Sequence, residues 1–233
     1  MAHRQQQFTK IVLDVAGDWR AREDVVAAIA ARSPGWKYAG RLLVEIATHR
    51  TFHLDVMDRE GALAGSAAQQ FRYESPEVSA DRPAGLRLRF TAPAGTLDMA
   101  RLALTAAATL ATAGATRVEC RSSGGSVAAA SLGTLAADTA PAALASAFVA
   151  LQVDAASARS CGMQSLGLPD ALVVSSAEDA RAVLGRFQAG LIAGLKPKAG
   201  ARFDAFGLAH EVCADIDRED PRFNPYGRWR LSA

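Results

Sequence analysis

Segments in which apolar and polar residues alternate are separated along this chain by segments with the periodicity of an amphipathic helix. In residues 8–15, Ile11, Leu13 and Val15 share one face, which is the pattern of a half-buried strand. After Ser176 the apolar positions are 180, 183, 184, 187, 191 and 192, the spacing of one buried helical stripe. Strands and helices that succeed one another in this way predict a fold in which helices pack on sheets.

The first part of the chain predicts the order βαββαβ, the split-βαβ arrangement of ferredoxin-like folds. The expected strands are 8–15, 38–47, 51–57 and 86–90, and the expected helices are 20–32, which Asp18 would cap, and 62–71. The second part repeats this rhythm more loosely, with helices at 97–113, 126–137 and after Ser176, strands at 117–121, 157–163 and 171–175, and a hairpin around Gly207. Residues 147–153 fit a strand or a helix. We predict an α+β protein with two ferredoxin-like halves, 1–94 and 95–233, packed as one continuous unit with antiparallel or mixed sheets.

The composition argues against several classes of partner. Half of the residues are hydrophobic, which supports a sizeable core, and 26 basic residues nearly cancel 24 acidic ones. No overall field would therefore attract nucleic acid or a membrane surface. The most apolar stretch, 102–115, is too short for a spanning helix, which needs about 20 apolar residues. The polar segment 1–7 and three scattered cysteines predict a cytoplasmic protein.

The weak catalytic candidates are Cys161 and His210. Cys161 lies in the glycine-rich segment 160–170, and a reactive thiol needs a base or cation beside it. His210 could supply the base only through tertiary folding. Cys213 would face away from His210 on the same strand. A thiol-dependent hydrolase or transferase that uses Cys161 is our alternative function, and a tight structural turn is the simpler interpretation of the segment.

Two further motifs have structural explanations that we favour. His49 and His53 have the spacing of metal ligands on a helix, but their segment alternates like a strand and offers no third ligand. The turn 122–126 would precede a helix and could hold an anion at free amides, which would suit a nucleotide sensor. It lacks the Gly-Lys-Ser/Thr ending of a phosphate loop. We expect no metal site and no cofactor.

The aromatic and basic tail 221–231 is expected to lie across its own domain, with Tyr226 and Trp229 as anchors. Stacking with nucleic acid is the alternative, but four acidic residues just before the tail would repel phosphate. Arginine, tryptophan and tyrosine dominate the hot spots of protein interfaces. The candidate binding residues are therefore Trp36, Arg87, Arg89, Tyr226 and Trp229.

Two motifs carry a resemblance to a known family. The segments Ser160-Cys161-Gly162-Met163 through Leu166-Gly167-Leu168-Pro169-Asp170 and Asn224-Pro225-Tyr226-Gly227-Arg228-Trp229-Arg230-Leu231 are similar to an uncharacterised bacterial family with a C-terminal domain of unknown function. The resemblance covers mainly residues 159–233 and implies no catalytic residues. In size, compartment and α+β build, such proteins resemble toxin-immunity and secretion-associated proteins, an analogy of fold alone.

These observations predict a non-enzymatic cytoplasmic protein that binds another protein. The resemblance suggests an effector or a toxin as that partner. The oligomeric state and the order of the strands in the sheets are left open by the sequence.

Overall fold

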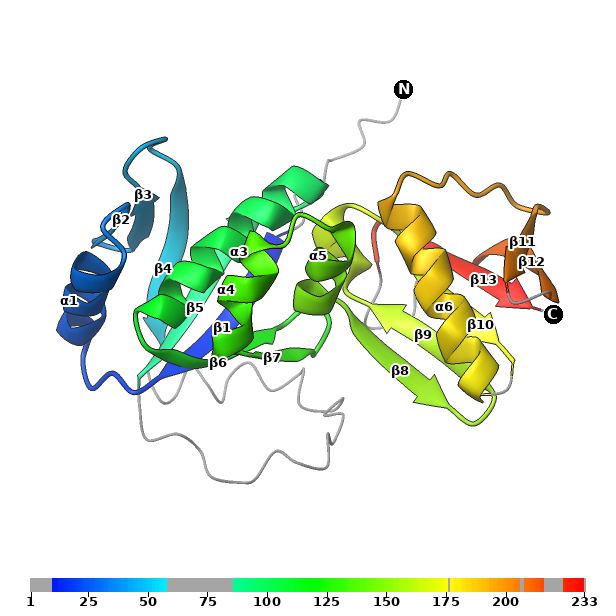
Figure 1. Cartoon of the computed structure of the whole chain (residues 1–233), viewed down its shortest axis with the longest axis horizontal. Coiled ribbons are helices and arrows are strands. Elements are labelled where there is room, and N and C mark those ends of the chain that lie inside the picture. Colours follow the sequence, from blue (N-terminus) through cyan, green and yellow to red (C-terminus); the bar gives the residue numbers. More distant parts are fainter. Residues whose placement is uncertain (1–9, 58–85, 176, 206–207, 216–223, 233) are drawn as a thin grey trace. The chain divides into compact units, whose positions relative to one another are not determined.

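The computed structural model describes residues 10–57, 86–175, 177–205, 208–215 and 224–232 (Figure 1). The chain divides into two compact units. The N-terminal unit comprises Ile11–Ala92 and Arg101–Thr139, and the C-terminal unit comprises Pro93–Ala100, Ala140–Ala233 and Lys10. Each unit has its own sheet, and the antiparallel and mixed pairings confirm the predicted α+β class. The helix predicted at 62–71 lies outside the described residues.

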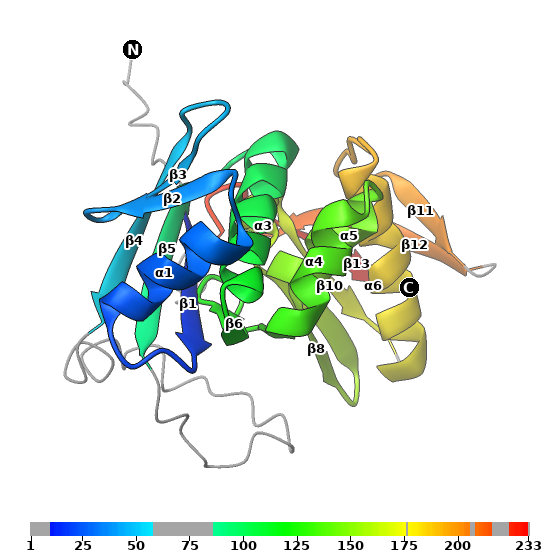
Figure 2. The same ribbon diagram turned by 60° about the vertical axis from the view of Figure 1, so that its left-hand side comes forward.

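The N-terminal unit is built on a seven-stranded sheet with the order β2-β3-β4-β5-β1-β6-β7. Its strands are β1 (Lys10–Gly17), β2 (Trp36–Ala39), β3 (Leu42–Glu45), β4 (Thr51–Met57), β5 (Arg87–Pro93), β6 (Ala115–Cys120) and β7 (Ser126–Ala128). Its helices are α1 (Arg22–Arg32), α3 (Leu97–Thr112, from Arg101 onwards) and α4 (Ala129–Ala137). Figure 2 shows α1 and α3 next to each other in front of this sheet. Alternate residues of the strands are buried, as the two-residue period predicts.

The strand predicted at 38–47 is a hairpin. Gly40 adopts a left-handed conformation with φ of 60°, which lets the chain turn between β2 and β3. Tyr38 then pairs with Leu43, and Ala39 pairs with Leu42. The alternating pattern runs through both strands, so the turn does not interrupt it. Five strands, β1 to β5, are therefore described where the sequence predicted four.

The starts of two helices also differ from the prediction. Ala21, and not Asp18, is the N-cap residue of α1, and Oδ2 of Asp24 in the first turn accepts hydrogen bonds from the amides of Arg20 (2.8 Å) and Ala21 (3.1 Å). These backbone hydrogen bonds lower the pKa of Asp24. Residues 126–128 form β7 against β6, so the helix predicted at 126–137 begins at Ala129. The turn 122–126 therefore leads into a strand and not into a helix.

The C-terminal unit has a six-stranded sheet with the order β11-β12-β13-β10-β9-β8. Its strands are β8 (Ala150–Asp154), β9 (Ser157–Cys161), β10 (Asp170–Val174), β11 (Arg202–Ala205), β12 (Leu208–Asp215) and β13 (Arg228–Ser232). Its helices are α5 (Pro141–Phe148), the short η2 (Met163–Leu166) and α6 (Ala177–Ile192). The pairing of β10 with β13 is parallel, and the other pairings are antiparallel. Helix α6 packs on one face of this sheet (Figure 1).

The tail is part of this sheet. Strand β13 lies between β10 and β12 and pairs with both over its whole length. The predicted docking of the tail is thus confirmed, but Tyr226 is wrong as an anchor because it is 43% exposed. In the described part of the tail, which begins at residue 224, Asn224 and Leu231 are buried and Trp229 is half-buried. Side chains alternate between the two faces of β13, and this alternation points Leu231 into the core. Tyr226 is in the turn before the strand, and its side chain is therefore not part of that core.

Among the described helices, none combines the length and the apolar character that a membrane span requires.

Candidate functional site

Asp170, the first residue of β10, is the centre of a buried polar network. Its Oδ1 accepts hydrogen bonds from the Ser160 hydroxyl (3.2 Å) and the Met163 amide (3.2 Å). Its Oδ2 accepts one from Nδ2 of Asn224 (2.9 Å). Asp170 is only 5% exposed, and a buried carboxylate needs such donors because it has lost its hydration. The network joins the segment 160–170 to the tail, and we call it the Asp170–Asn224 clasp.

The other members of the clasp also have partners. The Ser160 hydroxyl oxygen accepts a hydrogen bond from the Ala171 amide (2.8 Å), and Asn224 Nδ2 also donates to the carbonyl of Leu168 (2.9 Å). Asn224 Oδ1 accepts a hydrogen bond from the amide of Tyr226 (2.8 Å). A network in which each group has a partner rigidifies the chain around it. The segment 160–170 and the start of the tail at Asn224 therefore meet in this clasp.

Burial raises the pKa of Asp170 from 3.8 to about 6. The hydrogen bonds from Asn224, Met163 and Ser160, together with the charge of Arg228, act in the opposite direction. Desolvation outweighs these donors, but the pKa stays below neutral pH. The carboxylate is therefore ionised at pH 7, the form that accepts hydrogen bonds with both oxygens.

Asp170 should make the stability of the protein depend on pH. The folded protein keeps this proton up to about pH 6, whereas the unfolded chain loses it near pH 3.8, so the free energy of unfolding falls as the pH rises between these values. Asp170→Asn removes the titration. The unfolding free energy of the wild type, relative to this variant, should fall by about 2 kcal/mol from about pH 4 to about pH 8 in urea titrations. Asp204→Asn removes an exposed carboxylate of the same unit and is the control. A difference that is constant with pH would contradict the raised pKa.

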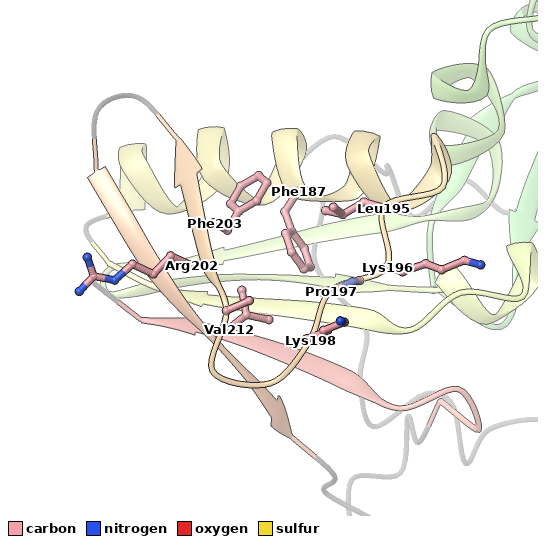
Figure 3. Close-up of a pocket in the computed structure, with 9 residues that line it drawn as sticks. Phe187, Leu195, Lys196, Pro197, Lys198, Arg202, Phe203 and Val212 are labelled. Atoms are coloured by element: carbon pink, nitrogen blue, oxygen red, sulfur yellow. The ribbon is translucent and has the colours of Figure 1, made fainter.

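A cavity of about 210 Å³ opens at the end of α6, and we call it the hollow (Figure 3). It is formed by the end of α6, the loop after it, β11 and β12. Its lining residues are Phe187, Leu195, Lys196, Pro197, Lys198, Ala201, Arg202, Phe203 and Val212. All of them belong to the C-terminal unit.

The floor of the hollow is apolar and ordered by packing. Phe187 is fully buried, and its ring meets that of Phe203 edge to face at 5.0 Å between centroids, a favourable geometry. Val212 is 1% exposed, and Leu195 forms an open wall at 41% exposure. The loop is fixed by backbone hydrogen bonds: the Leu195 amide donates to the carbonyl of Gly190 (2.8 Å), and the Val212 amide donates to that of Ala201 (2.9 Å). The hollow is thus formed before any ligand binds.

The edge of the hollow is basic. Lys196, Lys198 and Arg202 are exposed, and the nine lining residues include no acid. In Figure 3, Lys196 and Arg202 extend outward on opposite sides of the floor. Within the described part of the chain, none of the three forms a salt bridge. Glu211 is directly across from Arg202 on β12 and offsets part of its charge, so Lys196 and Lys198 dominate the field.

Cys161 and His210 do not form a catalytic pair. Cys161 is on β9 and His210 on β12, and β10 and β13 lie between these strands. Three strand spacings separate them by about 14 Å across the sheet, well beyond the reach of a proton transfer. Cys161 is also buried, at 6% exposure. The sequence could not show this separation, because strand order in a sheet does not follow chain order.

The turn 122–126 uses its own amides. Those of Ser123 and Gly124 donate to the carbonyl of Cys120, and that of Gly125 donates to the hydroxyl of Ser123 (3.1 Å). These three amides are therefore not available to an anion, and the predicted helix start is absent from this turn. The geometry therefore supports a turn with a structural role and not an anion-binding site.

The two histidines with metal-ligand spacing are both exposed, His49 in the turn after β3 and His53 on β4. Among the described residues, no group of three or more His, Cys, Asp or Glu could hold a metal ion. His49 has a positive φ of 56°, so the segment that carries the pair is not a helix.

The five predicted binding residues are divided between the units. Trp36, Arg87 and Arg89 belong to the N-terminal unit, and Tyr226 and Trp229 belong to the C-terminal unit. Nε of Arg89 donates to Asp14 (3.0 Å), so its charge is largely compensated. The ring of Trp36 lies against Phe52, with 6.0 Å between centroids. None of the five lines the hollow.

Sequence reasoning missed the residues of the hollow. The available signal was local: two of the four lysines in the chain, Lys196 and Lys198, flank Pro197 directly after the most regular helix. The apolar partners of these lysines come from β11 and β12, and only folding brings them together. Comparisons of the chain with family models, with curated proteins and with solved structures gave no match.

Proposed function

We propose that this protein is a non-enzymatic binding module that recognises another protein through the hollow. The observation that carries the proposal is the preformed apolar floor with a basic edge. Interface hot spots are well-packed apolar pockets that take a large side chain of the partner and are surrounded by polar residues. The hollow has this composition, and the sheet and helix that form it are fixed by packing and hydrogen bonds.

The size of the hollow favours a protein partner over a small ligand. Pockets for drug-sized molecules and cofactors have volumes of about 300–1,000 Å³. The hollow, at about 210 Å³, is smaller and open to solvent. It has room for one large side chain, and the surrounding surface would make the remaining contacts.

The cellular setting is part of the same proposal. None of the three cysteines forms a disulfide, which is typical of proteins in a reducing compartment. We therefore place the binding module in the cytoplasm, with an effector or toxin as the partner class that the family resemblance suggests. A role similar to that of immunity or secretion-associated proteins would agree with this placement.

Capture experiments with two matched variants test the proposal. Leu195→Ser removes the open wall of the hollow, and Leu151→Ser changes an equally exposed leucine (42%) on the edge strand β8 of the same unit. Tagged wild type and Leu151→Ser should retain one protein from a lysate of the producing cells at near-equal stoichiometry. Leu195→Ser should retain about tenfold less, because losing an apolar contact of this size costs about 1–2 kcal/mol.

The proposal fails on either of two results. Equal retention by both variants would show that the partner binds elsewhere, and a wild type that retains no protein would remove the basis for a binding module. Thermal denaturation of each variant shows whether the fold is intact.

A further inference from the structure

We infer that the hollow takes an acidic segment of a partner protein that inserts one large apolar side chain. This inference rests on the proposed function and adds the chemistry of the partner. Its first basis is the floor, where Phe187 and Val212 are buried beneath the opening and Leu195 stands at its side. An aromatic or leucine side chain placed over that floor would cover the exposed part of Leu195 and the partly exposed surfaces of Pro197 and Phe203.

Charge complementarity is the second basis. Lys196, Lys198 and Arg202 surround the opening, and no lining residue is acidic. The chain as a whole is nearly neutral, so this local excess is a property of the hollow and not of the composition. Carboxylates on both sides of the inserted side chain would meet cations on both sides of the floor (Figure 3). Such pairs at an exposed edge increase the association rate and make binding sensitive to salt.

Other anionic partners fit the geometry less well. Single-stranded nucleic acid stacks its bases on open aromatic faces, but Phe187 is fully buried and the ring of Phe203 lies against it. Interfacial membrane binding inserts apolar side chains that project from the surface. In the hollow the aromatic side chains are recessed, which suits a partner that supplies the projecting group.

The test uses a labelled peptide in which a central tryptophan is flanked on both sides by aspartate and glutamate. Fluorescence anisotropy should give a Kd on the order of 10 μM for the full chain, a value typical of a short segment with one anchor. Replacing the tryptophan of the peptide by alanine, or its acids by lysine, should weaken binding at least about tenfold. Raising the salt concentration should weaken it as well.

The variants of the protein separate the two bases of the inference. Lys196→Glu combined with Lys198→Glu should weaken binding of the acidic peptide about tenfold. Lys10→Glu combined with Lys37→Glu gives the same net charge by changing the other two lysines, both exposed, and should leave the Kd unchanged. Leu195→Ser should weaken binding and Leu151→Ser should not. Circular dichroism confirms that each variant is folded.

Three results would overturn the inference. In the first, the peptide with lysines in place of its acids binds as tightly as the acidic peptide. In the second, the variant changed at Lys196 and Lys198 and the variant changed at Lys10 and Lys37 bind the acidic peptide equally. In the third, the protein binds phosphatidylserine–phosphatidylcholine vesicles but not the acidic peptide. If the peptide fails but a captured protein is still lost in Leu195→Ser, the binding module stands and only the acidic chemistry is wrong. If the wild type also captures no protein, or if Leu195→Ser and Leu151→Ser retain it equally, the proposed function is wrong as well.

Discussion

A chain that ends at Asp220 should lose the cooperative folding of its C-terminal unit. Such a chain lacks β13, which forms hydrogen bonds with β10 on one side and β12 on the other. It also lacks Asn224, so the buried carboxylate of Asp170 loses the partner of its Oδ2. Two interior strand edges would be left without partners, and one oxygen of a buried carboxylate would lose its donor; each of these losses costs several kcal/mol. The sum approaches the whole stability of a small unit.

Hydrogen–deuterium exchange gives the measurement. Amides of α6 and β10 should exchange at rates close to those of an unfolded chain in the truncated protein, whereas those of β1 and β4 should stay protected. Protection of β10 after truncation would show that the remaining strands form the sheet without β13.

A point variant tests the same contact without removing the strand. Leu231 is fully buried on β13, so Leu231→Ala should lower the free energy of unfolding of the C-terminal unit by about 2–5 kcal/mol. Leu151→Ala, on the exposed edge strand β8, should cost less than about 1 kcal/mol. Similar losses in the two variants would mean that β13 is peripheral to the core.

Gly167→Ala should destabilise the C-terminal unit by at least about 3 kcal/mol. The backbone of Gly167 has φ of 74°, a conformation that costs other residues about 1–2 kcal/mol. A Cβ at this position would lie 2.1 Å from the carbonyl oxygen of Gly95. The atom that this Cβ would meet belongs to the backbone, so the chain itself has to move, and Asp170 of the clasp is three residues away. A drop in melting temperature of about 10–20 °C is the expected result.

Gly185→Ala is the matched control for this substitution. Gly185 is on α6, and a Cβ there would meet no atom within 4 Å. Alanine favours the helix by about 0.4–1 kcal/mol, so this variant should melt at a slightly higher temperature than the wild type. If Gly167→Ala had the same melting temperature as the wild type, residue 167 would not lie as close to Gly95 as the structure places it.

Local pattern predicted the elements of this fold better than their connections. The alternation in 51–57 and the apolar stripe after Ser176 correspond to β4 and α6. The pattern could not reveal the turn at Gly40, because alternation continues through the hairpin and only the left-handed backbone separates the strands. Residues 126–128 pair with β6, and the β-branched Val127 at their centre favours a strand, so the helix begins only at Ala129.

The candidate site was less accessible to sequence reasoning than the fold. Asp170 and Asn224 are within the two motifs singled out from the sequence, but their hydrogen bond joins residues 54 positions apart. This hydrogen bond depends on the parallel pairing of β10 with β13, and no rule based on neighbouring residues predicts that pairing. The hollow likewise needs Phe187 from a helix and Val212 from a strand, with a loop between them.

The position of β13 also determines when the C-terminal unit can fold during synthesis. Strands β8 to β10 and helix α6 leave the ribosome first, followed by β11 and β12, yet β10 and β12 are joined only through β13. Because β13 is translated after the other described strands of this sheet, the nascent chain exposes two unpaired strand edges until residues 228–232 emerge. Such edges are sites of aggregation, so the translation of residues 208–232 is the interval in which a chaperone would protect this protein most effectively.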